Sequence, residues 1–162
     1  MPPVLQPGLD PRPATLDPFP MRIAIDTNIL IAALVRPEGT SAGIVQAWRA
    51  GALEVVTSDA TMREAEAVLG AWLARMTSRE AVAQLLDDLR KRTVRAEDPP
   101  RITDLRLKDP GDLRLVEAAV AAGAAYIVTT DREFLSRRGY GGVEFVTPED
   151  FQQRMVSGYT DT

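Results

Sequence analysis

Two short apolar runs of this chain each lead into an aspartate. Ile23–Ile25 is followed by Asp26, and Tyr126–Val128 is followed by two threonines and Asp131. Apolar runs of this length, when helical patterns follow them, are typical of buried parallel strands. In an open α/β sheet, ligands bind just beyond the carboxyl ends of such strands. Carboxylates gathered there repel one another, and a divalent metal ion offsets that repulsion. The pattern therefore predicts a metal site.

A third acidic element, Asp109-Pro110-Gly111-Asp112, lies between the two runs and opens a predicted helix. An aspartate at the N-cap, a proline at the first helical position and an acid at the third make a strong helix start. A helix start alone would explain these three residues without any catalytic role. The two roles are compatible, because a carboxylate in the first helical turn is held rigidly and can still face a metal ion.

Asp26 and Asp131 also have two interpretations. Each could cap the helix that follows it, as Asp, Thr and Asn often do. Asn28 could cap the first of these helices alone, which would leave Asp26 free to bind a ligand. The repetition of a strand followed by an acid favours the functional interpretation. Thr27 and Asn28 add a hydroxyl and an amide group beside Asp26, and Thr129 could orient a carboxylate or a water molecule.

The predicted helix after Ser58 carries two further acids, Glu64 and Glu66. At 100° per residue, these two glutamates fall on opposite edges of the apolar stripe of the helix. Either could reach a site at the edge of the sheet, although most acids in such positions are solvated. Periodicity does not choose between them.

The composition limits the chemistry that this chain can perform. It has neither cysteine nor histidine, which excludes disulfides, zinc–thiolate sites, Ser-His-Asp catalysis and an imidazole base. The remaining oxygen ligands suit Mg²⁺ or Mn²⁺. The formal net charge of -4 argues against a broad nucleic-acid-binding surface but not against a local basic rim. No apolar stretch is long enough to span a membrane.

The 162 residues fit one domain with a terminal segment at each end. Residues 1–20 hold seven of the twelve prolines and show no helical or strand period, so we expect a disordered, partly PPII arm. No basic segment followed by an apolar core marks a signal peptide there. Met21 stands directly before the first strand and could be the true start. We expect the domain over residues 21–156 and a tail over residues 157–162.

From Met21 onward, predicted strands and helices alternate. Strands are expected at 22–25, 53–56, from 94, at 125–128 and at 143–146. Helices are expected at 28–35, 41–50, from 58 or 59 to 76, 79–92, 110–122, 132–136 and 148–155, with a turn at 139–142. Alternating strands and helices favour an α/β fold, a three-layer α/β/α domain with a mostly parallel central sheet.

Taken together, four motifs of this chain resemble those of the PIN-domain nucleases. They are the opening Ile-Ala-Ile-Asp-Thr-Asn-Ile-Leu, the Ser58–Glu64 helix start, the Asp-Pro-Gly-Asp element, and Tyr-Ile-Val-Thr-Thr-Asp-Arg-Glu-Phe-Leu near the end. The resemblance covers roughly residues 21–152 and is nearest to the toxins of bacterial toxin–antitoxin pairs. By this resemblance Asp26, Glu64, Asp112 and Asp131 would be the catalytic, metal-binding acids. It is the resemblance that favours Glu64 over Glu66.

The resemblance implies a cytoplasmic ribonuclease that hydrolyses RNA phosphodiesters with Mg²⁺ or Mn²⁺. Asp109 would be auxiliary, and Thr27, Asn28 and Thr129 could position the water or the phosphate. An antitoxin protein and a second copy of the chain are the partners it suggests. Leu113 stands where some relatives carry another acid or Asn, so one or two ions would fit. The candidate RNA-binding residues are Arg36, Arg132, Arg137 and Arg138.

Two other classes of function stay open at this point. A PIN-like interaction module could keep the fold and the acids without binding metal. A phosphotransfer domain with an aspartyl intermediate would also place Asp after the first strand. That mechanism needs a second acid two residues after Asp26, or a lysine after a late strand, and residue 28 is Asn. A dinucleotide-binding fold is excluded because no Gly-x-Gly-x-x-Gly follows the first strand.

Overall fold

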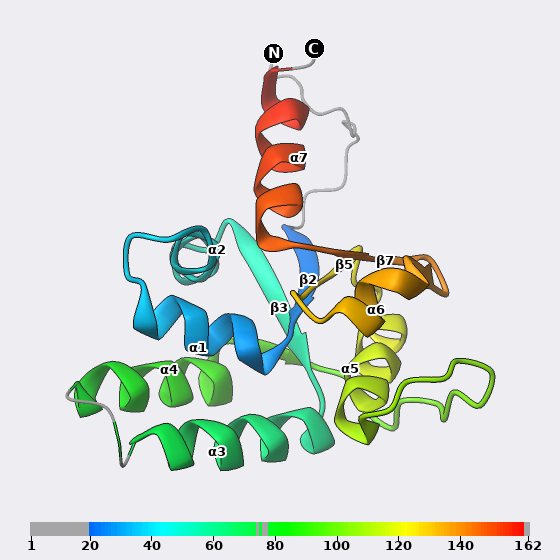
Figure 1. Cartoon of the computed structure of the whole chain (residues 1–162), viewed down its shortest axis with the longest axis horizontal. Helices are drawn as coiled ribbons and strands as arrows, with labels where there is room; N and C mark the ends of the chain where they lie inside the picture. Colours follow the sequence, from blue (N-terminus) through cyan, green and yellow to red (C-terminus); the bar gives the residue numbers. More distant parts are fainter. Residues whose placement is uncertain (1–19, 74, 76–77, 161–162) are drawn as a thin grey trace.

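A six-stranded sheet forms the middle layer of the chain, with helices on both of its faces (Figure 1). The computed structural model describes residues 20–73, 75 and 78–160. The spatial order of the strands is β4-β3-β2-β5-β7-β6, and only the edge pair β6–β7 is antiparallel. The strands are β2 (Met21–Ile25), β3 (Leu53–Thr57), β4 (Thr93–Arg95), β5 (Tyr126–Val128), β6 (Gly139–Tyr140) and β7 (Val143–Val146).

The central strand β2 shows why these apolar runs form a parallel sheet. It pairs in parallel with β3 and β5, with Ile23 opposite Val55 on one side and Tyr126 on the other. Ile23 and Ile25 pack into one core cluster, whereas Ala24 packs into the cluster on the opposite face. Both faces of the strand are therefore covered, as its continuous apolar sequence requires.

The helices divide between the two faces of the sheet. Ile23 and Ile25 share a core cluster with residues of α1, α2, α3, α4 and α7, and Ala24 shares the other with α5 and α6. On the first face, Phe151 of α7 is buried and meets Tyr126 of β5 edge-on, with ring centroids 5.5 Å apart. The helices are α1 (Thr27–Val35), α2 (Thr40–Arg49), α3 (Asp59–Leu73), α4 (Arg79–Lys91), α5 (Pro110–Ala121), α6 (Arg132–Arg137) and α7 (Pro148–Thr160).

The predicted fold class is confirmed, and one strand was missed. Residues 139–142 were expected to form only a turn, but Gly139–Tyr140 pairs with β7 as strand β6. Gly141 and Gly142 make the hairpin turn with φ of +59° and +85°, a backbone conformation that favours glycine. A two-residue strand is too short to produce an alternating pattern, so the sequence shows only its glycines.

Two predicted ends differ from the structure or lie outside it. Helix α7 continues to Thr160, beyond its predicted end at Met155, so it includes residues 157–160 of the segment 157–162 that was predicted as a tail. Gly158 lowers helix propensity by about 1 kcal/mol relative to alanine, which weakens a helix without ending it. The predicted end of the long helix at Met76 and nearly all of the predicted arm over residues 1–20 lie outside the described residues. No helix in the described ranges is long and apolar enough to cross a membrane.

Candidate functional site

Asp26 leaves strand β2 and caps helix α1. One carboxylate oxygen, Oδ1, accepts a hydrogen bond from the backbone N–H of Asn28 at 3.3 Å, and Oδ2 accepts one from the Thr129 hydroxyl at 2.8 Å. The side chain is almost fully buried. The prediction that Asn28 could cap this helix alone is wrong, because the extended backbone before α1 belongs to Asp26. Thr27 is buried in the first turn, whereas Asn28 is exposed.

Thr129 joins the two strand ends that carry Asp26 and Asp131. Its hydroxyl donates to Asp26 and accepts from the backbone N–H of Asp131 at 3.0 Å. Asp131 in turn caps helix α6, because its Oδ1 accepts from the N–H groups of Glu133 at 2.8 Å and Phe134 at 3.4 Å. Thr129 is fully buried, so this link between the loops after β2 and β5 is shielded from water.

The Asp109–Asp112 element begins helix α5 as its residue types predict. Asp109 is the N-cap, and its Oδ1 accepts from the backbone N–H of Gly111 at 2.8 Å. Asp112 lies in the first turn and is 8 % exposed, although its side chain accepts no hydrogen bond from another described residue. Since burial of an unpaired carboxylate is costly, the position of Asp112 is not explained by the helix start alone.

Of the two glutamates on α3, Glu64 faces α5 and Glu66 faces α4. A Cβ atom placed on Gly111 would lie 1.7 Å from Oε1 of Glu64, so this carboxylate packs directly against the first turn of α5. Glu66 forms an ion pair with Arg90 of α4, with 3.0 Å between Nε and Oε2. The structure thus brings Glu64, and not Glu66, to the acids that follow β2 and β5.

The acids brought together here destabilise each other's charged forms. Burial is the main reason that the pKa of Asp112 is raised to about 7, and the charges of Asp26, Asp109, Asp131 and Glu64 raise it further. Burial also raises the pKa of Asp26 and of Glu64, and neighbouring carboxylates add to both shifts. No lysine or arginine appears among the causes of these shifts. Among the described residues, no positive charge therefore compensates the cluster.

The four carboxylates come from separate elements, and two of them also cap helices. Within the described ranges, no group of three or more acidic side chains is arranged to hold a metal ion. Two of them are engaged in caps, Asp26 at α1 and Asp131 at α6. The carboxylates of Glu64 and Asp112 belong to α3 and α5, which pack against each other.

The four predicted RNA-binding arginines have different positions relative to the acids. Arg36 follows the last turn of α1, at the opposite end of that nine-residue helix from Asp26, and is not brought to the cluster. Arg132 is exposed directly after Asp131. Arg137 donates from Nε to the Arg106 carbonyl at 3.2 Å, and Arg138 is exposed at the end of α6. Only Arg132 is thus adjacent in sequence to a clustered acid.

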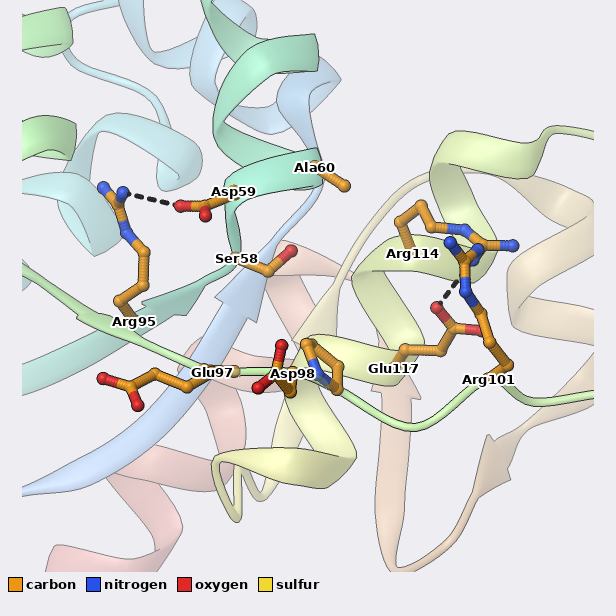
Figure 2. Close-up of a pocket in the computed structure, with 11 residues that line it drawn as sticks. Ser58, Asp59, Ala60, Arg95, Glu97, Asp98, Arg101, Arg114 and Glu117 are labelled. Atoms are coloured by element: carbon orange, nitrogen blue, oxygen red, sulfur yellow. Dashed lines mark hydrogen bonds and ion pairs between the residues drawn. The ribbon is translucent and has the colours of Figure 1, made fainter.

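Three arginines that the sequence analysis did not single out surround a cavity of about 520 Å³ (Figure 2). Arg95 ends β4, Arg101 lies in the loop before α5, and Arg114 lies in α5 two residues after Asp112. They are far apart in the sequence, and only the packing of α5 beside β3 gathers them. The position of Arg95 at the end of a short strand was the one signal that could have marked it.

We expect the metal-free chain to lose stability as the pH rises from about 4 to about 7. In this range the folded chain keeps a proton on Asp112, with a pKa of about 7, that the unfolded chain with a pKa of 3.8 has released. Unfolding then releases protons, so the free energy of unfolding falls with rising pH. A difference of one pKa unit between the folded and the unfolded chain changes the free energy of unfolding by about 1.4 kcal/mol, which is enough to move Tm by several degrees.

Thermal denaturation in EDTA at several pH values measures this effect. Asp112→Asn keeps the polar shape of the side chain and removes this titrating group, so its Tm should fall less over the same pH range, with the remaining fall due to Asp26 and Glu64. Equal pH dependence in the wild type and in Asp112→Asn would show that the charge of Asp112 is not destabilising in the fold.

Comparisons with known proteins agree with this arrangement of strands and helices. A family model described as "PIN domain" matches residues 22–133, which is more than half of the chain. The chain belongs to the PIN-domain family. One solved structure, described as VapBC2 from Rickettsia felis bound to a DNA fragment from their promoter, is similar with a TM-score of 0.53 and 16% identity. The match covers 77% of this chain and 97% of that one, and it shows a shared fold. No curated protein matches the chain in sequence.

Proposed function

We propose that this chain is a divalent-metal-dependent endoribonuclease of the cytoplasm, with Asp26, Glu64, Asp112 and Asp131 as its metal-binding acids. The observation that carries the proposal is a cluster of carboxylates from four separate elements, whose charges help to raise the pKa of Asp26, Glu64 and Asp112 with no cation from the described residues among the causes. Membership in a family whose members are generally nucleases supports it. RNA as the substrate rests on the resemblance to toxin-type members of that family.

The donor set of the cluster fits Mg²⁺ or Mn²⁺. Carboxylate oxygens are the ligands these ions prefer, and like charges a few ångströms apart are stable together only when protonated or when paired with a cation. When bound, such an ion lowers the pKa of a water molecule and neutralises charge that develops on the phosphate.

The surrounding residues hold the acids in place for this role. Both oxygens of Asp26 accept hydrogen bonds, one from the backbone of α1 and one from Thr129, which fixes the plane of the carboxylate. Thr129 fixes Asp131 through its backbone at the same time. Asp109 is exposed and occupied with the cap of α5, and its charge raises the pKa of Asp112 and Glu64. We therefore assign it an auxiliary, positioning role.

We expect millimolar Mn²⁺ to raise the Tm of the wild-type chain by several degrees above its value in EDTA. A ligand that binds only the folded chain stabilises it by mass action, by about 2.7 kcal/mol at 100 times its Kd. Asp26→Asn should keep the cap through Oδ1 and remove one charge, and its Nδ2 would donate to the Thr129 hydroxyl where Oδ2 of Asp26 accepts from it. Its metal-free form should be no less stable than the wild type, and its Tm should not respond to Mn²⁺.

The matched control for this measurement is Asp59→Asn. Asp59 is an exposed acid at the start of α3 that pairs with Arg95 and does not appear among the causes of the raised pKa values. Its Tm should respond to Mn²⁺ as the wild type does. A wild-type Tm that ignores millimolar Mn²⁺ would favour a PIN-like interaction module without catalysis.

We also propose that the chain is the toxin of a toxin–antitoxin pair. The support is the resemblance of its motifs to that branch and the likeness of its fold to a structure named for VapBC2. An uncontrolled ribonuclease would damage its host, and an arginine from a partner segment could pair with the acids and block them. Co-expression with the protein of the adjacent reading frame should rescue growth and give a co-purifying, inactive complex. Harmless expression of the chain alone, with nothing co-purifying, would contradict this proposal.

A further inference from the structure

A cavity at the ends of β3 and β4 lies on the same edge of the sheet as the acid cluster. Parallel pairing places Thr57 at the end of β3 opposite Arg95 at the end of β4, and β3 is the direct neighbour of β2. Neighbouring strands are about 4.8 Å apart. The residues after β4 are therefore only two strand spacings, roughly 10 Å, from Asp26 after β2. This distance refers to the end of the cavity at Arg95, and Arg101 and Arg114 lie at its other end (Figure 2).

The cations around the cavity are not equally compensated. Arg95 pairs with Asp59 at 3.0 Å, and Nη1 of Arg114 lies 3.0 Å from Oε1 of Glu117. Nη1 of Arg114 is nevertheless buried and makes no hydrogen bond of acceptable geometry. Arg101 is exposed, and its side chain has no ion pair or hydrogen bond with any residue in the described part of the chain. Figure 2 shows Arg101 and Arg114 at the same end of the cavity, beside Glu117.

Of the two guanidinium groups at this end of the cavity, that of Arg114 is paired with the Glu117 carboxylate, and that of Arg101 has no partner among the described residues. Glu117 is buried, and its other oxygen is already occupied because Oε2 accepts from the backbone N–H of Ile102 at 2.8 Å. The pair of arginines therefore retains unused donors and one positive charge. Glu97 and Asp98 also line the cavity and are exposed, as Arg101 is, so water screens all three charges. A group with a single negative charge and several acceptor oxygens, such as a phosphodiester, would complete this arrangement.

We infer that Arg101 and Arg114 form a subsite for a backbone phosphate of the RNA strand, beside the one at the acid cluster. The inference rests on the proposed ribonuclease function. Arg101 supplies the free guanidinium, and Glu117 fixes Arg114 through the ion pair that the two residues make within α5. The subsite orients the strand along the carboxyl edge of the sheet and takes no part in bond cleavage.

Binding of a fluorescein-labelled single-stranded RNA oligonucleotide to the full chain, followed by anisotropy at several salt concentrations, tests the inference. The measurement uses the Glu64→Gln background with Mn²⁺ present, so that cleavage does not interfere. Arg101→Gln should weaken binding about 5- to 10-fold and lower the slope of log K against log salt by about 0.7, the value for one phosphate contact on a single strand. Because Arg101 has no partner in the described fold, its Tm should not change.

Two further variants sharpen this measurement. Arg101→Lys keeps the charge and should retain most of the salt slope. Arg79→Gln removes an exposed arginine at the start of α4, away from the cavity, and should leave affinity and slope unchanged. With Glu64 restored, Arg101→Gln should raise KM for RNA and leave kcat nearly unchanged.

The possible failures are distinguishable. If the wild type cleaves RNA while Arg101→Gln binds with unchanged affinity and salt slope, the subsite is wrong and the proposed function stands. If the wild type neither binds nor cleaves RNA, both are wrong. If Arg101→Gln weakens capture of an acidic partner protein and leaves RNA binding unchanged, the cavity is a protein-binding site and the subsite is overturned.

Discussion

Glu64→Gln should lower the rate of RNA cleavage by about 100-fold or more with little change in the fold. Loss of a residue that merely supports a metal ligand costs about 10- to 100-fold, so loss of a ligand carboxylate should cost at least as much. Glutamine keeps the length and shape of the side chain against Gly111, where Glu64 packs. Because burial and two other carboxylates oppose the charge of Glu64, the metal-free variant should be at least as stable as the wild type.

Glu66→Gln is the matched control, since it makes the same change on the same helix. Glu66 pairs with Arg90 at the surface, and exposed pairs of this kind contribute at most about 1 kcal/mol. We expect its cleavage rate to stay within about twofold of the wild type. Initial rates on one RNA oligonucleotide at saturating Mn²⁺ compare the two variants. Equal losses in both, or none in either, would remove Glu64 from the proposed site.

Gly111→Ala, at the contact between α3 and α5, should lower metal binding and cleavage while leaving the stability of the fold nearly unchanged. The new Cβ would lie 1.7 Å from Oε1 of Glu64, so the carboxylate must move by more than an ångström. That atom is the end of a flexible side chain, and alanine is favoured over glycine in helices by about 1 kcal/mol. We therefore expect a Tm close to that of the wild type, together with a loss of about 10-fold or more in Mn²⁺ affinity and in cleavage rate.

Gly70→Ala provides the control for this substitution. Gly70 lies on α3 as Glu64 does, and no atom lies within 4 Å of the Cβ position. Alanine there should raise the Tm slightly and leave Mn²⁺ affinity and cleavage unchanged. The Mn²⁺ dependence of Tm and of the cleavage rate measures both variants. A Gly111→Ala chain with full metal response would mean that Glu64 can bind a metal ion from a different position.

Local sequence patterns were sufficient for most of the fold and for part of the candidate site. Asp26 and Asp131 follow apolar strands, and the parallel neighbours β2 and β5 place both residues at one edge of the sheet. The residue types at 109–112 predicted a helix start, and Asp109 is the N-cap of α5 in the structure. These features depend on neighbours in the sequence or on one strand pairing, which is why the residues alone predict them.

The remaining features depend on contacts between distant segments. The helical period alone would allow either Glu64 or Glu66 to reach the acid cluster. Glu64 packs against α5, where Gly111 has no side chain and leaves space for its carboxylate. Burial of Asp112 also follows from packing and not from its position in the helix. Arg101 and Arg114 belong to a loop and a helix with no shared pattern, so the cavity that they line could not be predicted.

The most direct test of the central claim is cleavage of an RNA oligonucleotide by the purified wild-type chain, first in EDTA and then after Mn²⁺ is restored. Removal of the metal leaves the carboxylates without the cation that their mutual repulsion requires. We predict no cleavage in EDTA, full recovery with Mn²⁺, and no recovery when the same chain carries Asp26→Asn. Cleavage that persists in EDTA, or that survives Asp26→Asn, would contradict the assignment of this cluster as a metal-dependent nuclease site.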